Sequence, residues 1–488
     1  MTAQHFSYLK ELAEIVGPEN VLEKEEVLEE YSFDYSFVPP KRPSVVVRPG
    51  SAEEVRRVVK VALRHRTPLV PCSSGPPRFR GDTVPEKEGS IVLDLSRMRE
   101  IIAISRRNKV AVIEPGVTFG QLIPELKKKG LRLYGPLLPR ANKSALTSAL
   151  EREPVLMPRY QWDILDPLVC GEVVCGTGEV LRTGEAALVE SKEELKKGEL
   201  TSHMGPGPFD PIRIIQGAQG TMGIMTWGVI RCDLLPTVEY LFFVPSQDLE
   251  KLVDLAYALL RRRLGEIIFI LNRFSLAGVL GKDRKEWEEL STALPPWTLI
   301  LTVAGYEWFP EERVGYQEEE IKGMARERGL ELETSLAGKG GEKVKGLLES
   351  PPEKPWRLKY GIFQEIPFLT TMDRTPSFVD LMLRTAKKHG YPPEKMGIYI
   401  QPLVQGVCCH VGFDLFYETP DERGTVRELF VRASETLLEA GAFFSRPYGY
   451  LARIVYKKDA DAARLLRRVK EIFDPQGILN PGKLCFWG

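Results

Sequence analysis

The feature that most constrains the fold is a short β-branched strand followed directly by a capped helix. Residues 44–49 read Ser-Val-Val-Val-Arg-Pro, and a Pro-Gly pair ends the run. Ser51 then begins a helix with Glu54 at the capping-box position, and its apolar residues recur at helical spacing. The order repeats, with strands expected at 90–95 and 109–114 and a second capped helix from Thr118. Such alternation predicts an α/β unit.

A second set of elements follows after about residue 236. With 488 residues, the chain is too long for a single ordinary core. A strand pattern covers 168–184, and residues 212–232 are predicted to form a strand, a tight turn and a strand. Further strands are expected at 240–244, 267–271 and 298–303, with helices at 249–262 and 460–473. We therefore predict three segments, 1–235, 236–439 and 440–488.

Charge and composition argue against several classes of partner. Lys plus Arg and Asp plus Glu both number 67, so the net charge favours neither nucleic acid nor an anionic membrane. No apolar run reaches the roughly 18 residues of a membrane span, and the first residues lack a signal-peptide pattern. The seven cysteines include no C-x-x-C pair, so we expect buried thiols in a reducing cytoplasm. An iron–sulfur relay would then require another subunit.

The common nucleotide-binding motifs are absent, since neither G-x-G-x-x-G nor G-x-x-x-x-G-K-[ST] occurs. Another series runs along the chain instead: Arg-Pro-Gly-Ser at 48–51, a Ser/Gly loop at 72–85, Glu-Pro-Gly-Val at 114–117, Gly-Ala-Gln-Gly-Thr-Met-Gly at 217–223 and a turn-rich stretch at 474–483. In this order, these pieces resemble the FAD-binding domain of the vanillyl-alcohol oxidase / p-cresol methylhydroxylase (PCMH-type) superfamily. That superfamily includes glycolate oxidase subunits and D-lactate dehydrogenases.

The resemblance implies an α+β fold in two parts. Residues 1–235 and the returning segment 440–488 would form the PCMH-type FAD-binding domain. Residues 236–439 would form an α/β cap, or substrate domain, with an antiparallel sheet flanked by helices. The isoalloxazine ring is expected at the interface, where pockets commonly form.

The loop at 72–85 is the expected site of the FAD diphosphate. Phosphates need backbone N–H donors at close approach, which Ser73, Ser74, Gly75 and Gly81 permit. Pro76 and Pro77 delete two donors, and Arg78 and Arg80 either compensate or are solvated surface residues. The resemblance adds these cofactor-binding residues: Asp82, Thr83, Pro139, Ser144, Asp166, Gly217, Gly220, Thr221, Gly223, Ile224 and Lys483. For the glycines of 217–223, a plain β-turn is the alternative.

Residues 138–166 depart from the family pattern, which is rich in Gly and Asn here. Lys143 or Arg159 would place positive charge near the reduced flavin and raise its potential, and surface salt bridges are the alternative role. Covalent attachment in this family usually uses a His. The loop at 72–85 has none, so we expect non-covalent FAD, with Cys72 as the residue that would make this wrong.

On the substrate side, the family's metal motif is incomplete. Many 2-hydroxy-acid members carry H-x-G-D-G-N-x-H and a later E-H-G, but here only His410 matches, with Tyr417 and Pro447 at two other ligand positions. One imidazole cannot hold a divalent ion, so no metal is predicted. Residues 444–448 and 482–487 look similar to the phenol-oxidising branch.

This similarity implies that Arg446 and Tyr448 hold an anionic oxygen, with His410 as base or hydrogen-bond donor. The structural alternatives are a packed aromatic for Tyr448, a domain-interface ion pair for Arg446 and a satisfied core histidine for His410. Four further residues are expected in cap strands that line the pocket: Gln364, Glu365, Tyr399 and Gln401.

The expected function is that of an FAD-dependent dehydrogenase. It takes hydride from a C–H next to oxygen to flavin N5, from a phenolic alcohol, an alkylphenol or a 2-hydroxy acid. Electrons would pass to a quinone or to an iron–sulfur or electron-transfer flavoprotein partner, in a homo-oligomer or a heteromeric complex. The alternative is a flavin-binding, non-catalytic subunit of a larger electron-transfer complex.

Overall fold

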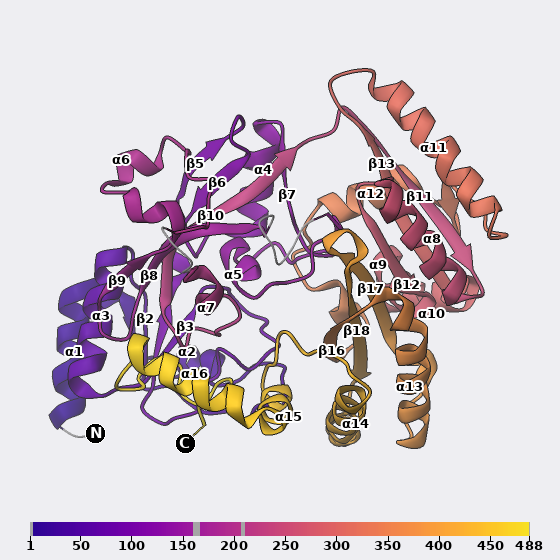
Figure 1. Cartoon of the computed structure of the whole chain (residues 1–488). Coiled ribbons are helices and arrows are strands. Elements are labelled where there is room, and N and C mark those ends of the chain that lie inside the picture. Colours follow the sequence, from indigo (N-terminus) through magenta and orange to yellow (C-terminus); the bar gives the residue numbers. More distant parts are fainter. Residues whose placement is uncertain (1–2, 160–165, 206–209, 488) are drawn as a thin grey trace.

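The computed structural model describes residues 3–159, 166–205 and 210–487. The N-terminal part is a four-stranded sheet in the order β1 (Val21–Leu22), β2 (Val45–Val47), β4 (Ile91–Asp94), β3 (Leu69–Cys72). Strands β2 and β3 run parallel to β4. Helices α1 (Ala3–Val16) and α3 (Ala52–His65) pack on one face and α2 (Glu25–Ser32) on the other (Figure 1). The predicted helix start is confirmed, because the Ser51 side chain accepts a hydrogen bond from the Glu54 N–H.

A second, six-stranded sheet lies beside it. Its order is β5 (Ile101–Ser105), β6 (Val110–Ile113), β10 (Ile224–Leu234), β8 (Leu168–Val174), β9 (Val180–Arg182), and β7 (Leu131–Leu133) also pairs with β10. All its pairings are antiparallel. Its helices are α4 (Phe119–Lys128), α5 (Ala145–Leu150), α6 (Lys192–Leu195) and α7 (Ile212–Ile215).

The strand predicted at the start of 212–232 is wrong. Residues Ile212–Ile215 form the helix α7, and the strand begins only at Ile224. Pro211 precedes the helix with helical dihedral angles, which suits a first helical turn. Ile212 and Ile215 are the buried pair, and this i, i+3 spacing gives the short segment one apolar helical face despite its β-branched residues.

The middle of the chain forms a six-stranded antiparallel sheet, called here the cap sheet. Its order is β11 (Val238–Ser246), β13 (Trp297–Gly305), β12 (Ile268–Asn272), β17 (Gly397–Leu403), β18 (Cys408–Tyr417), β16 (Ile362–Thr370). One face packs on α8 (Leu249–Arg262), α11 (Pro310–Arg326), α13 (Thr375–Lys388) and α14 (Pro420–Glu439). Part of the other face packs on α9 (Arg273–Leu280), α10 (Arg284–Ala293) and α12 (Gly341–Glu349). A small hairpin, β14 (Ser335–Leu336) and β15 (Lys339–Gly340), completes this part.

The alternation of side chains along β16 and β18 decides which residues face away from the helices α13 and α14. Phe368 and Phe413 belong to the core beneath those helices, whereas Phe363 and Phe416 belong to the opposite face. Because the side-chain period of a strand is two, Glu365 shares the second face with Phe363, and His410 shares it with Phe416.

The last segment returns to the first part of the chain through α15 (Tyr450–Lys458) and α16 (Ala460–Phe473) (Figure 1). The Leu69 N–H donates to the Ile478 carbonyl and the Asn480 N–H to the Leu69 carbonyl, both at 2.7 Å. The Asn480 side chain donates to the Asp82 carbonyl at 2.8 Å and to the Gln219 carbonyl at 2.7 Å. Residues 474–480 therefore join strand β3 to the loops that contain Asp82 and Gln219, while the three segment boundaries stay a prediction.

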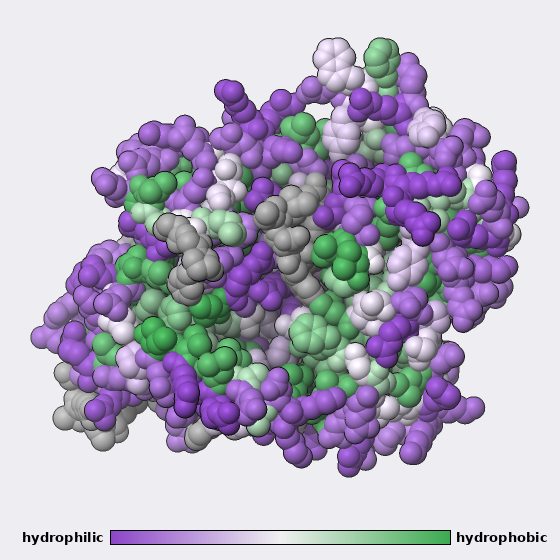
Figure 2. Space-filling view, viewed as in Figure 1, coloured by the Kyte–Doolittle hydropathy of each residue, from purple (hydrophilic) through white to green (hydrophobic). Residues whose placement is uncertain are grey.

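On the face seen in Figure 2, hydrophilic side chains form most of the rim, and hydrophobic ones gather toward the middle. In the part of the chain that the structure describes, no helix has both the length and the apolar character needed to cross a membrane.

Candidate active site

A cavity of about 310 Å³ lies between the first part of the chain and the cap sheet. Its walls come from the loops at 71–83, 136–154 and 215–225, from 355–367 and Tyr399 of the cap, and from 446–451. Asn480 contacts two of these loops, at Asp82 and at Gln219, so the cavity depends on segments far apart in sequence.

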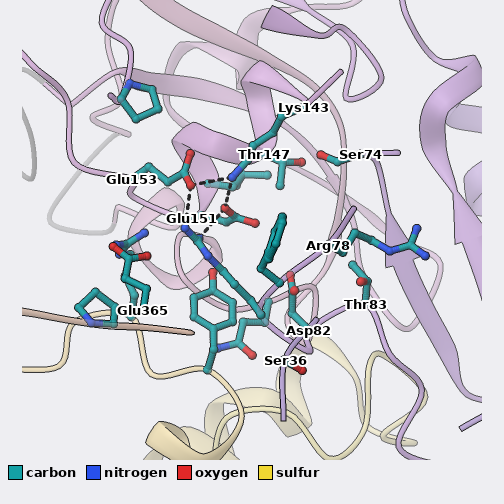
Figure 3. Close-up of a pocket in the computed structure, with 18 of the residues that line it drawn as sticks. Ser36, Ser74, Arg78, Asp82, Thr83, Lys143, Thr147, Glu151, Glu153 and Glu365 are labelled. Atoms are coloured by element: carbon teal, nitrogen blue, oxygen red, sulfur yellow. Dashed lines mark hydrogen bonds and ion pairs between the residues drawn. The ribbon is translucent and has the colours of Figure 1, made fainter. Parts of the chain in front are cut away.

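Four charged side chains form a compact cluster in this cavity, called here the ion quartet (Figure 3). Arg80 and Lys143 each lie 2.7 Å from a carboxylate oxygen of Glu151 and of Glu153. Burial alone would raise the pKa of Glu153, but the charges of Lys143 and Arg80 hold it well below its usual range. The quartet is internally neutral.

Arg78 is buried too, and its guanidinium has protein partners. It donates to the Glu30 carbonyl at 2.6 Å and lies over the Tyr31 ring at 4.5 Å. Figure 3 shows it pointing away from the quartet. The expected alternative of a solvated surface residue is wrong for Arg78, which is only 8% exposed, and Arg80 is held by the quartet. Both guanidinium groups are engaged by the protein itself.

The turn at 73–75 lies at the cavity, and Ser73 and Ser74 line it. Ser73 and Thr147 share a hydroxyl–hydroxyl hydrogen bond, and the Ser74 hydroxyl accepts from the Ser144 N–H at 3.1 Å. Within the described ranges, the N–H groups of residues 73–75 donate no backbone hydrogen bond. A side chain on Gly220 would overlap Pro71, so a close approach of these two loops requires glycine there.

Most of the predicted cofactor-binding residues lie in the cavity wall: Ser73, Ser74, Arg78, Arg80, Asp82, Thr83, Pro139, Gly217, Gly220, Gly223 and Ile224. Asp82 is crowded, and its burial and then the charge of Glu151 raise its pKa to about 6. The Thr83 hydroxyl has no hydrogen-bond partner among the described residues, so the wall contains an unused donor.

The other predicted cofactor-binding residues lie behind the wall. Ser144 caps α5, and the Thr221 hydroxyl donates to the Ala218 carbonyl at 2.6 Å. Asp166 accepts from Gln216 at 3.0 Å and Lys483 pairs with Glu86 at 2.9 Å. Gly75 and Gly81 also stand outside the lining, and a side chain on Gly81 would overlap Val38. These contacts hold the loops, and a direct role at the cofactor stays a prediction.

Lys143 and Arg159, proposed as charges beside the flavin, are both in ion pairs. Lys143 belongs to the quartet, whereas Arg159 pairs with Glu266, away from the cavity wall. Residues 160–165 of the same segment lie outside the described residues.

On the cap side, Arg446 and Tyr448 line the cavity, and His410 lies just behind Glu365. Arg446 is 4% exposed, and its Nη1 has no hydrogen-bond partner in the described chain. His410 Nε2 is likewise unpartnered and lies 3.8 Å from Glu365 Oε1. Burial, followed by the charge of Arg446, lowers the pKa of His410 to about 3, so the imidazole is neutral.

Of the four expected cap residues, three line the cavity and one holds a lining residue in place. Gln364, Glu365 and Tyr399 line the cavity. Gln401 does not: it accepts from the Tyr399 hydroxyl at 2.8 Å and donates to the Ile268 carbonyl at 3.0 Å, so it fixes Tyr399 in place.

Several wall residues were missed in the sequence: Arg140, Glu151, Glu153, Trp356 and Arg357. The charges of residues 151–153 resemble those of an exposed turn, and nothing local separates them from surface residues. The one available signal was their place in a segment where the family pattern lacks such charges.

The two other positions of the metal motif lie apart from His410. Tyr417 packs on the opposite face of the cap sheet, stacked on Phe37 at 6.2 Å, and the Pro447 carbonyl accepts from Gln219 at 2.8 Å. Among the residues described, no group of three or more His, Cys, Asp or Glu is arranged to hold a metal ion.

Comparisons with known proteins agree with this architecture. Residues 43–184 match the family described as FAD binding domain, and 373–484 match FAD linked oxidases, C-terminal domain. The glycolate oxidase subunit GlcD of Bacillus subtilis is 28% identical over 231 residues, which cover 47% of this chain and 45% of that protein.

Two solved structures share the fold along the whole chain. The 4-ethylphenol oxidase of Gulosibacter chungangensis has a TM-score of 0.84 at 19% identity, and p-cresol methylhydroxylase has 0.83 at 20%. Each comparison covers 100% of this chain and 98% of the other. Both family matches fall on the segments that build the cavity, and the chain belongs to the FAD-dependent oxidoreductases of the vanillyl-alcohol oxidase / p-cresol methylhydroxylase superfamily.

Proposed function

We propose that the chain oxidises a small substrate with an anionic oxygen, and that a para-substituted phenol is the substrate class that fits best. The observation that carries this proposal is Arg446. A buried guanidinium without a partner is costly, and an anionic ligand offsets that cost. Aromatic side chains line the same cavity, namely Trp356, Phe363, Tyr399 and Tyr448, and they suit a planar substrate.

The residues of the cavity also fit FAD. The N–H groups of residues 73–75 and the unpartnered Thr83 hydroxyl would hold its polar groups, and the apolar wall at 137–139 would contact the ring system. When bound, FAD supplies the two-electron acceptor of the reaction.

The remaining roles fall to the chain itself. Arg446 binds the anionic oxygen. Burial, followed by the charge of Glu151, raises the pKa of Tyr448, so its hydroxyl keeps its proton and donates a hydrogen bond to the same oxygen. His410 is neutral. Its Nε2 has no hydrogen-bond partner among the described residues, lies 3.8 Å from Glu365 Oε1, and donates a hydrogen bond toward the substrate.

A 2-hydroxy acid is the second candidate substrate. The partial similarity to a glycolate oxidase subunit favours it, and its carboxylate would occupy the same guanidinium. For either substrate we propose that electrons leave to an iron–sulfur or flavoprotein partner. The seven free cysteines, six of them buried, support a reducing, cytoplasmic setting.

The test is an anaerobic titration of the FAD-loaded chain with para-alkylphenols, para-hydroxybenzyl alcohols and both enantiomers of simple 2-hydroxy acids, following the flavin absorbance. Phenols should bleach the flavin. Arg446→Met should slow bleaching about a hundredfold or more, and Arg446→Lys should slow it less. Arg432→Met, at an exposed residue of α14, is the control. Bleaching by hydroxy acids alone would replace the phenol proposal, and bleaching by neither class would leave a non-catalytic flavin subunit.

A further inference from the structure

Arg140 is another buried guanidinium in the cavity that lacks an anionic partner among the described residues. It is 8% exposed, and its one hydrogen bond runs from Nη1 to the Asn142 amide oxygen at 3.2 Å. No ion pair engages it within the described ranges. Among the neighbouring cations, Arg80, Lys143 and Arg357 each contact a carboxylate, and Arg78 donates to the Glu30 carbonyl and lies over the Tyr31 ring.

This arrangement is unfavourable for the chain alone. A guanidinium has five N–H donors, and one bond to a neutral amide leaves most of them unused. Burial lowers the pKa of Arg140 to about 10, which still leaves it charged at neutral pH. A buried positive charge of this kind is stabilised when an anion enters the cavity.

The position of Arg140 indicates which anion. Asn142, its hydrogen-bond partner, donates from Nδ2 to the Pro76 carbonyl at 3.0 Å, and its amide lies 3.7 Å from the Cβ position of Gly75. Arg140 is thereby linked to the turn whose N–H groups at 73–75 are unused. Arg140, Ser73 and Ser74 all line the same cavity.

The backbone around Arg140 is fixed in place. The Lys143 N–H donates to the Arg140 carbonyl at 3.1 Å, and the Ala141 N–H donates to the Pro352 carbonyl of the cap part at 2.7 Å. The Ser144 N–H is held by Ser74 at 3.1 Å. The backbone that carries the guanidinium is therefore held in place, next to the segment that contacts the turn through Asn142 and Ser144.

We propose that Arg140 binds the diphosphate of FAD and supplies the positive charge that Arg78 and Arg80 cannot give from their present partners. A planar guanidinium matches phosphate oxygens with two parallel N–H donors. The backbone donors of residues 73–75 complete the binding site from the other side.

The experiment uses the full-length chain stripped of flavin. The affinities for FAD and for riboflavin, which lacks phosphate, are measured for the wild type, Arg140→Met and Arg140→Lys, together with the melting temperature of each apo form. Arg140→Met should weaken FAD binding about ten- to a hundredfold and reduce its salt dependence. Riboflavin affinity should stay the same, and Arg140→Lys should recover part of the loss.

The apo melting temperature separates a ligand role from a structural one. Removing an unpaired buried charge should leave the apo Arg140→Met chain as stable as the wild type or more so. Arg152→Met is the matched control, because burial also lowers the pKa of Arg152 but its guanidinium contacts Gln216, outside this cavity. Unchanged FAD affinity, or an equal loss for FAD and riboflavin with a less stable apo chain, would overturn the proposal. No substrate enters the experiment, so its outcome is independent of the proposed reaction.

Discussion

Replacing Glu153 by Gln tests whether the ion quartet stabilises the chain. The Glu153 carboxylate is 13% exposed and contacts Arg80 and Lys143 at 2.7 Å and the Ser148 hydroxyl at 2.5 Å. The variant leaves two buried cations sharing the single carboxylate of Glu151. Breaking a buried pair in this way costs about 3–5 kcal/mol, and we expect about 3 kcal/mol because the site opens onto a cavity.

The control is an ion pair with the same N–O distance but a much more exposed carboxylate. Glu193 and Lys196 also lie 2.7 Å apart, yet the Glu193 side chain is 78% exposed. Glu193→Gln should therefore cost less than about 0.5 kcal/mol. Urea unfolding of the apo chains at pH 7, followed by tryptophan fluorescence, measures both values.

The pH dependence gives a second readout. The folded-state pKa of Glu153 lies below the ordinary value of 4.5, so its stabilisation is present above about pH 4.5 and is lost as the pH falls further. The difference between wild type and Glu153→Gln should narrow in that acid range. Equal unfolding free energies for Glu153→Gln and Glu193→Gln at pH 7 would refute the reasoning.

Three further outcomes are expected. His410→Gln should keep more of its stability than the wild type as the pH falls from about 6.5 toward 3, because the buried imidazole resists the protonation that the unfolded chain accepts. Acid unfolding of both chains measures this, and an equal loss of unfolding free energy with falling pH in the two chains would contradict it. Gly412→Ala should lower substrate turnover while FAD binding persists, because the new Cβ would lie 3.1 Å from Glu365 Oε1 and 3.3 Å from His410 Nε2; steady-state kinetics with a flavin titration checks it, and unaltered turnover would count against it. The flavin should separate fully from the chain on a denaturing gel, because burial raises the pKa of Cys72 to about 11 and the thiol is unreactive; a fluorescent protein band would show covalent attachment.

Elements set by local chemistry could be predicted from the sequence. The helices at 249–262 and 460–473 have the predicted limits, and Ser51 and Thr118 cap the helices they were expected to cap. In each case a hydroxyl or carboxylate near the first turn and a one-sided apolar pattern are enough, because both act within a few residues.

Features that depend on distant contacts could not be predicted. The ion quartet joins Arg80 to Glu151 and Glu153, which are more than 70 residues away, and in the sequence these charges cannot be distinguished from those of a solvated turn. The same limit applies to Arg140, because the sequence does not show that its guanidinium lacks a carboxylate partner among the described residues of the folded chain. The strand expected at the start of 212–232 was wrong because two local signals conflict. The β-branched residues of 212–215 favour a strand, whereas the preceding proline favours the first turn of a helix.

The contacts that Asn480 makes with the loops at Asp82 and Gln219 have a consequence for biosynthesis. Asn480 holds the Asp82 carbonyl across 398 positions of the chain, with the entire cap translated in between. A nascent polypeptide on the ribosome therefore carries Asp82 for most of its elongation without the Asn480 side chain that donates to its carbonyl. A premature stop codon before residue 474 would yield a polypeptide in which the Asp82 and Gln219 carbonyls lack the side chain that joins them.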